Sequence, residues 1–146
     1  PTLQLRAMEL GFTFNQVLTL ASIIEKETGE GSERPLISSV FHNRLKQKMR
    51  LQTDPTVIYG QIERHDGNIS KEDLKRDTPY NTYTNFGLPP GPIANPGLDS
   101  IQAALYPSSS DYLYFVSKNN GTHQFSGNIR DHINAVNLYQ KVPAKN

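Results

Sequence analysis

Leu20-Ala-Ser-Ile-Ile-Glu-Lys-Glu-Thr-Gly29 is the stretch of sequence that decides the fold. With the preceding Thr13-Phe-Asn-Gln16, it predicts a helix whose apolar residues recur at helical spacing and which Gly29 can end. The last turn of this helix carries two acids, Glu25 and Glu27. Because the negative end of the backbone dipole lies there, a carboxylate is unfavourable and its pKa is expected to rise.

A carboxylic acid that stays protonated in a cleft suits glycosidic bond cleavage, because it can protonate the departing oxygen. Glu25 and Glu27 lie on the two flanks of the apolar stripe, and periodicity alone barely separates them. Glu27 is closer to the helix end and stands at the mouth of a loop, which favours it as the acid. The alternative is that both are solvated charges, as most helical glutamates are.

The whole chain has the composition of one globular domain. It has 146 residues, of which 36% are hydrophobic and 20% are charged. A net charge of +1 gives no argument for nucleic acid, and the lack of cysteine excludes disulfides and thiolate metal sites. The start Pro1-Thr-Leu-Gln-Leu-Arg6 does not have the pattern expected of a signal peptide, and the sequence has no run of about 18 apolar residues. Because the chain starts without Met and in the middle of a pattern, we expect a fragment of a longer protein.

The rest of the pattern predicts an α+β fold that is mostly helical, with a small antiparallel sheet late in the chain. Five further helices are expected, after the N-caps Ser32, Asp54 and Ser70 and around residues 101–105 and 129–136. The proline- and glycine-rich segment 78–97 should be an ordered loop. Asn120-Gly121, between the apolar segments 112–116 and 123–125, predicts a β-hairpin.

Polar and aromatic side chains in three segments are candidates for binding a sugar, because sugars select aromatic faces and amides. These residues are Gln52, Thr53, Asp54, Tyr80, Asn81, Thr82, Tyr83 and Tyr114. Asp54 is available as a second carboxylate, although capping of the following helix explains it equally well. Core packing is the favoured interpretation for Phe115 and for one residue of each of the pairs Tyr80/Tyr83 and Tyr112/Tyr114.

No metal or cofactor site is expected from the sequence. His42, His65, His123 and His132 lack ligand spacing, and no serine lies in a nucleophile elbow. The basic run from Arg44 to Arg50 is most simply a solvated helix end.

Eight blocks of sequence together match the pattern of one known family. They are Ala21-Ser-Ile-Ile-Glu-Lys-Glu-Thr28, Ser32-Glu-Arg34, Val40-Phe-His-Asn-Arg-Leu45, Met49-Arg-Leu-Gln-Thr-Asp-Pro-Thr-Val-Ile-Tyr-Gly60, Tyr80-Asn-Thr-Tyr-Thr84, Gly87-Leu-Pro-Pro-Gly-Pro-Ile-Ala94, Pro96-Gly97 and Tyr112-Leu-Tyr-Phe-Val116. In these blocks the chain resembles the MltG (YceG-like) family of endolytic murein transglycosylases, and the resemblance covers roughly residues 13–140.

This resemblance implies a lytic-transglycosylase-like catalytic domain with Glu27 as its single catalytic residue. The Glu27-Thr28 pair is also similar to the Glu-Ser pair of other lytic transglycosylases. The implied reaction cleaves the β-1,4 bond between N-acetylmuramic acid and N-acetylglucosamine without water and leaves a 1,6-anhydro end. Peptidoglycan strands are the implied substrate and peptidoglycan synthases the implied partners, without cofactor or nucleic acid.

The resemblance further implies that residues 1–146 are one catalytic domain whose membrane helix and LysM-like region precede it in the full protein. The implied location is the outer face of the bacterial inner membrane. Two alternatives fit the same residues. One is a lysozyme-like hydrolase that uses Glu27 and Asp54, and the other is a glycan-binding module that tolerates the loss of Glu27.

Overall fold

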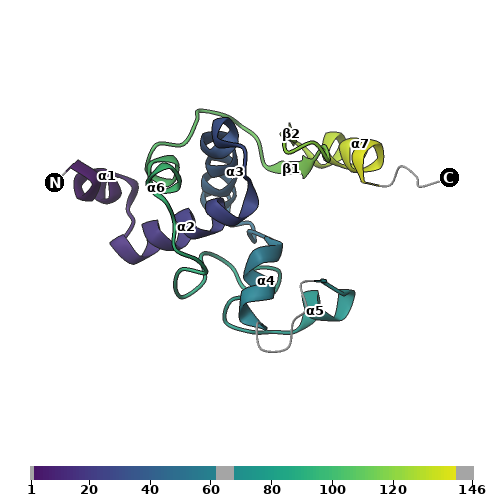
Figure 1. Cartoon of the computed structure of the whole chain (residues 1–146), viewed down its shortest axis with the longest axis horizontal. Coiled ribbons are helices and arrows are strands. Elements are labelled where there is room, and N and C mark those ends of the chain that lie inside the picture. The colour runs from purple at the N-terminus through teal and green to yellow at the C-terminus, as the bar shows by residue number, and fades with distance from the viewer. Residues whose placement is uncertain (1, 62–67, 141–146) are drawn as a thin grey trace.

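The computed structural model describes residues 2–61 and 68–140, so His65 lies outside the described residues (Figure 1). The elements in chain order are α1 (Thr2–Leu10), α2 (Phe14–Glu27), the 3-10 turn η1 (Gly31–Glu33), α3 (Arg34–Lys46), α4 (Asp54–Gly60), α5 (Lys71–Lys75), α6 (Leu98–Leu105), β1 (Tyr114–Ser117), β2 (His123–Ser126) and α7 (Ile129–Tyr139). The α+β class expected from the sequence is confirmed. Helix α1 is the one described helix that the sequence pattern did not predict.

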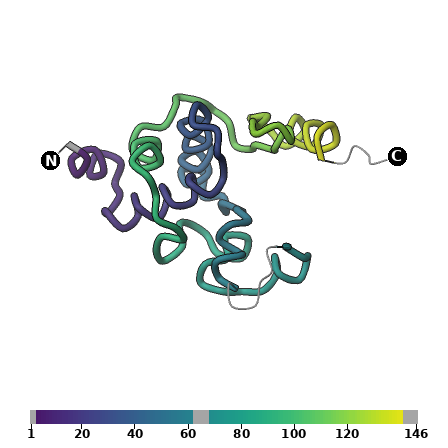
Figure 2. The backbone as a smooth tube through the Cα atoms, in the orientation of Figure 1, coloured from purple at the N-terminus to yellow at the C-terminus, as the bar shows by residue number. Residues whose placement is uncertain are grey.

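Helix α2 is the centre of the core. It begins at a capping box, in which the Thr13 hydroxyl accepts from the Gln16 backbone N–H at 3.1 Å and the Gln16 side chain accepts from the Thr13 N–H at 2.9 Å. Its residues Leu20, Ile23 and Ile24 are fully buried, and each such side chain contributes roughly 1.5–3 kcal/mol. The helix packs against α6, α3 and α4, which surround it in Figure 2. The end of α2 is therefore fixed in place.

Two helices begin differently from the sequence prediction. Ser32 does not cap a helix, because it lies in η1, and α3 starts after it with Pro35 in its first turn. A proline fits there because the first helical N–H groups have no partner within the helix. Asp54 is the first residue of α4 rather than its N-cap, and the N-cap residue Thr53 forms no side-chain capping bond. The predicted capping box of α5 is confirmed by the Ser70 hydroxyl.

The predicted hairpin is present, but its loop is longer than a two-residue turn at Asn120-Gly121. Strands β1 and β2 pair in antiparallel register and leave residues 118–122 as the loop. Within it, Asn119 and Gly121 take positive φ angles of 68° and 92°. Asparagine and glycine tolerate this left-handed backbone better than other residues. Asn120-Gly121 therefore predicted the hairpin correctly, but the expected two-residue turn was wrong.

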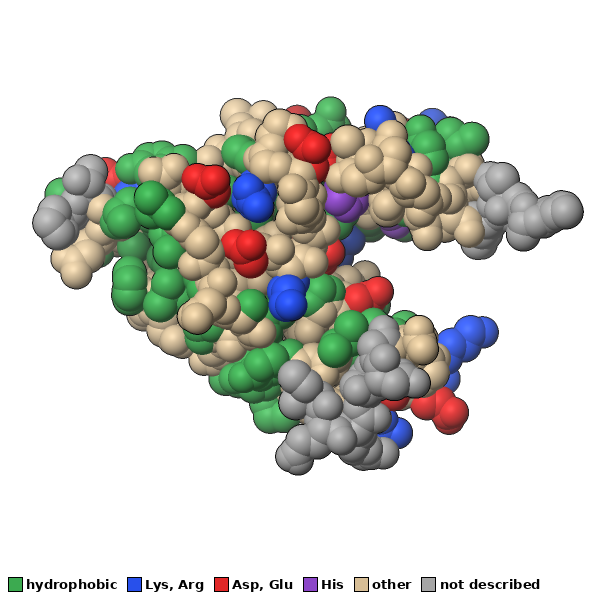
Figure 3. All heavy atoms as spheres, viewed as in Figure 1, with side chains coloured by type: hydrophobic (Ala, Val, Ile, Leu, Met, Phe, Trp, Pro, Cys, Tyr) green, Lys and Arg blue, Asp and Glu red, His purple; other side chains and the backbone are tan. Residues whose placement is uncertain are grey.

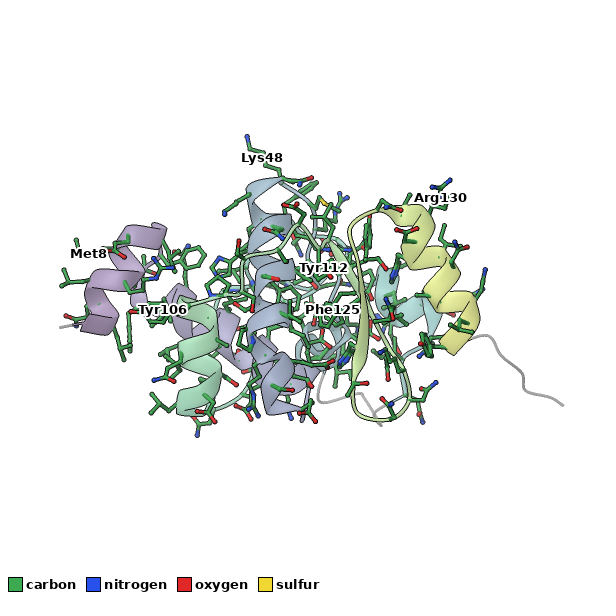
Figure 4. The ribbon with its side chains drawn as sticks, turned by 90° about the horizontal axis from the view of Figure 1, so that it is seen from above. Met8, Lys48, Tyr106, Tyr112, Phe125 and Arg130 are labelled. Atoms are coloured by element: carbon green, nitrogen blue, oxygen red, sulfur yellow. The ribbon has the colours of Figure 1, made fainter. Side chains whose placement is uncertain are left out.

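The hairpin and α7 form a small unit beside the helical body, held by the polar face of α3 (Figure 1). The Asn43 side chain donates to the carbonyl oxygens of Ser110 and Tyr112, each at 2.9 Å. Tyr112 stacks on Phe125 with ring centroids 5.6 Å apart, and Figure 4 shows both between α3 and the hairpin. These contacts fix one wall of the site described below.

The described residues include no single helix that is long and apolar enough to cross a membrane. Only α1 and α2 taken together pass that test of length and composition, and they are bent by 91° at their junction.

The start of α6 depends on a side chain from α2. The N-cap residue of α6 is Gly97, which has no capping side chain of its own. Glu25 replaces it, because its Oε1 accepts from the Gly97 N–H at 3.0 Å and from the Ser100 hydroxyl at 2.8 Å. These hydrogen bonds favour the ionised form and lower the pKa of Glu25.

We expect Glu25→Ala to lower the free energy of unfolding by about 0.5–2 kcal/mol, as the loss of a helix cap does. Because the folded-state pKa of Glu25 is lowered, this contribution is present at neutral pH and is lost as acidification protonates the carboxyl. Urea unfolding at pH 7 and in acid measures it. Lys26→Ala, at an exposed neighbour, is the control, and equal stability of the two variants would contradict the capping role.

Candidate active site

Glu27, the last residue of α2, lies in the wall of a cleft of about 570 Å³. The cleft is lined by the C-terminal end of α2, by α3, by the turn before α4, and by the hairpin and α7. In the space-filling view, a hollow opens between the hairpin–α7 unit and the α4–α5 region (Figure 3). The groove that the sequence led us to expect beside Glu27 is therefore present.

Burial raises the pKa of Glu27 to about 7, because desolvation disfavours the carboxylate. The Thr53 hydroxyl lowers the pKa of Glu27 and so opposes the effect of burial, whereas the negative charge of Asp54 raises the pKa further. Thr53 is only 2% exposed, and its hydroxyl makes no hydrogen bond of normal geometry to a described residue. Near neutral pH, Glu27 is therefore divided between its acid and its carboxylate form, so it can both donate and accept a proton.

The turn before α4 is held in an unusual backbone conformation. Gln52 has a positive φ of 53°, which a residue other than glycine keeps only where its surroundings enforce it. Residue Thr82 does so, because its carbonyl oxygen accepts from the Gln52 N–H at 3.3 Å and its hydroxyl accepts from the Thr53 N–H at 2.9 Å. The turn thereby brings Gln52 and Asp54 to the cleft.

Asp54 is paired with Tyr83 at the cleft. The Tyr83 hydroxyl donates to the Asp54 carboxylate at 2.6 Å. Burial and this hydrogen bond raise the pKa of Tyr83, so the phenol keeps its proton. Asp54 therefore places a negative charge beside Glu27, and it is not the N-cap of α4 that the sequence offered as the other interpretation.

The structure brings only some of the predicted binding residues to the cleft. Those that line it are Gln52, Asp54, Tyr83 and Tyr114, and those that do not are Thr53, Tyr80, Asn81 and Thr82. Asn81 is fully buried, where its side chain donates to the carbonyl oxygens of Leu74 and Arg76. A loop without regular backbone bonding needs such partners, so Asn81 and Thr82 hold the loop. The Tyr80 ring packs on Tyr59, 4.8 Å between centroids.

The side chains of the two glutamates of α2 have different partners and surroundings. Glu25 is engaged with the start of α6, whereas Glu27 faces the cleft. The hydroxyl of Thr28 accepts from the Glu30 N–H at 2.9 Å, so it is bound to the following loop. Among the described residues, Thr53 and not Thr28 supplies the hydroxyl that acts on Glu27.

Sequence reasoning missed Arg44, which it assigned to a solvated helix end. Arg44 lines the cleft and is only 7% exposed. Its Nε donates to the Leu113 carbonyl oxygen and its Nη1 to that of Arg50, each at 2.7 Å. Helical spacing could have predicted that Arg44 is buried, because it follows the buried Ile37 by seven residues and Phe41 by three.

Two histidines also line the cleft. The His132 ring stacks on Tyr114 at 4.8 Å, and burial lowers the pKa of His132. His123 is bound to Glu33, whose carboxylate oxygens lie 2.8 Å from the His123 Nδ1 and 3.0 Å from its backbone N. Within the described ranges, no three histidine, aspartate or glutamate residues are grouped so that they could hold a metal ion.

Comparison with known proteins gives one consistent result. The model of the YceG-like family matches residues 2–138. A Bacillus subtilis (strain 168) protein named endolytic murein transglycosylase is 50% identical over 125 residues, which are 86% of this chain and 34% of that protein. A Streptococcus pneumoniae D39 protein of the same name is 40% identical over 82% of this chain and 23% of its own length.

A solved crystal structure is similar to this chain as well. The crystal structure of a yceG-like protein from Listeria monocytogenes has a TM-score of 0.84 and 46% sequence identity. The match covers 91% of this chain and 43% of that one. This chain spans about a third of the length of the B. subtilis relative.

We expect Glu27→Gln to stabilise the fold at neutral pH. Because the folded-state pKa of Glu27 is raised to about 7, the wild type is fully stabilised below pH 4.5 and loses stability as the pH rises to 7. Glutamine does not titrate and has no such loss. The free energy of unfolding of the variant should therefore exceed that of the wild type by up to about 3 kcal/mol above pH 7 and equal it at pH 4. Urea unfolding across this range measures it, with Glu30→Gln as the exposed control. A difference that does not change with pH would rule out the raised pKa.

Proposed function

We propose that this chain, which belongs to the YceG-like family, is the catalytic domain of an endolytic murein transglycosylase in which Glu27 is both acid and base. The observation that carries this proposal is the position of Glu27 in the cleft with a pKa of about 7. The names of the B. subtilis and S. pneumoniae relatives support the same activity. Because the chain spans only part of those proteins, the proposal concerns this part.

In the first step, protonated Glu27 gives its proton to the oxygen between N-acetylmuramic acid and N-acetylglucosamine. The glycosidic bond breaks, the N-acetylglucosamine side leaves with a hydroxyl group, and positive charge develops at C1 of the muramic residue. A carboxyl pKa near the working pH is best for such a proton transfer.

In the second step, the Glu27 carboxylate takes the proton from the C6 hydroxyl of the same muramic residue. The C6 oxygen bonds to C1 and closes the 1,6-anhydro ring, which returns Glu27 to its acid form. Because the attacking oxygen belongs to the substrate, the step gains the effective molarity of an intramolecular reaction. The reaction therefore needs neither a positioned water nor a second catalytic carboxylate.

Two observations favour this reaction over its alternatives. One oxygen of Asp54 already accepts from Tyr83, so Asp54 is better suited to raising the pKa of Glu27 than to attacking a sugar. A module that only binds glycan gains nothing from a desolvated acid, which costs stability at neutral pH. We further propose that Gln52, Tyr83 and Tyr114, which line the cleft, contact the glycan.

We propose the outer face of the bacterial cytoplasmic membrane as the place of action, because murein lies there. The membrane helix and LysM-like region implied by the family resemblance would anchor the full protein, and peptidoglycan synthases would be its partners on nascent strands. Residues 1–146 would act as one catalytic domain within it.

We expect Glu27→Gln to lower the rate of glycan cleavage by about 10²–10⁴-fold, because the amide keeps the shape and removes the transferable proton. Mass spectrometry of the fragments released from purified peptidoglycan measures it, and wild-type products should be lighter than hydrolysis products by one water. Glu25→Gln is the matched control and should cut at temperatures where it stays folded. Activity in Glu27→Gln together with inactivity in folded Glu25→Gln would overturn the assignment.

We expect Asp54→Asn to keep the anhydro product and to shift the pH profile. Because the charge of Asp54 raises the pKa of Glu27, its removal should lower that pKa and move the alkaline limb of kcat/KM to lower pH. Initial rates between pH 4 and 9 measure the shift. Loss of turnover at every pH, with folding and glycan binding intact, would favour the two-carboxylate hydrolase instead.

A further inference from the structure

Arg44 is a buried cation in the cleft wall that has no counter-ion among the described residues. It is 93% buried, and the groups that it contacts are the carbonyl oxygens of Leu113 and Arg50 and the ring of Tyr114, 4.9 Å away. All three are neutral. A buried charge is costly unless it is paired, and carbonyl oxygens compensate it only in part.

Arg44 also has N–H donors that no described residue accepts from. A guanidinium carries five N–H donors, and two of the hydrogen bonds that they can form are made to described residues. Its Nη2 makes no hydrogen bond to a described residue and is not among the buried atoms without a partner, a group that does include Arg34 Nε and His132 Nδ1. The Nη2 of Arg44 is therefore accessible from the cleft that the residue lines.

The cleft holds charges of both signs. Glu27 ends α2 and Asp54 begins α4, whereas Arg44 comes from α3, and all three line the cleft. Arg44 is the one arginine or lysine among the described residues that line the cleft. Burial and the charge of Arg44 both lower the pKa of His132, so that ring does not share the positive charge at neutral pH.

We propose that Arg44 forms a carboxylate-binding subsite that holds the acidic substituent of the muramic residue during cleavage. This inference rests on the proposed function. Among the groups of a murein strand, the sugar hydroxyls and acetamido groups are neutral, and carboxylates occur only on the lactyl group or on the peptide attached to it. A planar guanidinium suits a carboxylate, and the Nη2 of Arg44 keeps N–H donors that no described residue uses. The subsite would make the enzyme prefer murein to a neutral glycan of the same backbone.

The test compares two substrates that differ only in charge. One is a murein strand with free peptide carboxylates, and the other is the same strand with these groups converted to neutral methylamides. The measured quantity is the ratio of kcat/KM on the charged strand to that on the neutral strand. We expect a ratio of roughly 10–100 for the wild type, in line with a charged hydrogen bond, and a ratio near one for Arg44→Gln.

The ratio separates recognition from folding, because a general loss of structure lowers both rates alike. Arg44→Lys should give an intermediate ratio, since it keeps the charge without the fork. Arg50→Gln is the control, because it removes an exposed cation whose side chain lies over Phe86, and its ratio should equal that of the wild type. A third strand, stripped of its peptides so that only the lactyl carboxylate remains, identifies which carboxylate is bound.

Two outcomes would overturn the subsite. They are a wild-type ratio near one together with cleavage of the peptide-free strand that does not depend on Arg44, and a rate that Arg44→Gln reduces equally on all three strands, which would give Arg44 only a structural role between α3 and β1. The dissociation constants of Glu27→Gln and of Glu27→Gln/Arg44→Gln for the same strands give the ratio without any cleavage. If the binding ratio depends on Arg44 but the wild type cuts neither strand, the proposed function fails and the subsite stands.

Discussion

The withdrawal of one carboxyl group from water is the constraint on which the rest of this structure depends. Helix α2 is buried along most of its length, and its last residue, Glu27, lies partly buried in the wall of the cleft. The resulting pKa of about 7 makes the group useful for proton transfer and unfavourable for stability. Globular domains are stable by only about 5–15 kcal/mol, so such a site has to be supported by well-packed surroundings.

Three acids near the end of α2 show how environment assigns chemistry. Glu25 accepts two hydrogen bonds and stays ionised, Glu27 is desolvated and is shared between its acid and carboxylate forms near neutral pH, and Asp54 is exposed and accepts from Tyr83. Groups of the same type whose pKa values are pushed apart are a mark of acid–base sites. A single catalytic glutamate supported by a fixed neighbouring charge is consistent with a reaction in which the substrate supplies its own nucleophile.

The sequence correctly predicted the structural features that local interactions determine. The capping boxes at Thr13 and Ser70 and the hairpin signal at Asn120-Gly121 involve residues close in the chain, so they could be read without the fold. The choice of Glu27 over Glu25 rested on its position near the helix end, but the periodicity barely separated the two residues and could not show what Glu25 does. The role of Glu25 depends on Gly97, which is 72 residues away from Glu25 and becomes its partner only after folding.

Other parts of the site were misjudged because residue type was given more weight than position. Asn81 and Thr82 suggested contacts with sugar, yet Asn81 donates to the backbone that precedes its loop and Thr82 accepts from the backbone of the turn before α4. Arg44 suggested a solvated helix end, yet its spacing from Ile37 and Phe41 places it on the buried face of α3. In both cases the pattern of neighbours carried more information than the charge or polarity of the residue.

The central claim is that Glu27 is a proton donor at neutral pH, and an NMR titration of its side-chain carboxyl carbon tests it most directly. The chain labelled with ¹³C-glutamate would be titrated from pH 3 to 9, with Glu27→Gln used to assign the resonance. The account predicts a midpoint of about 7 for Glu27. A midpoint near the ordinary value of 4.5 would contradict it.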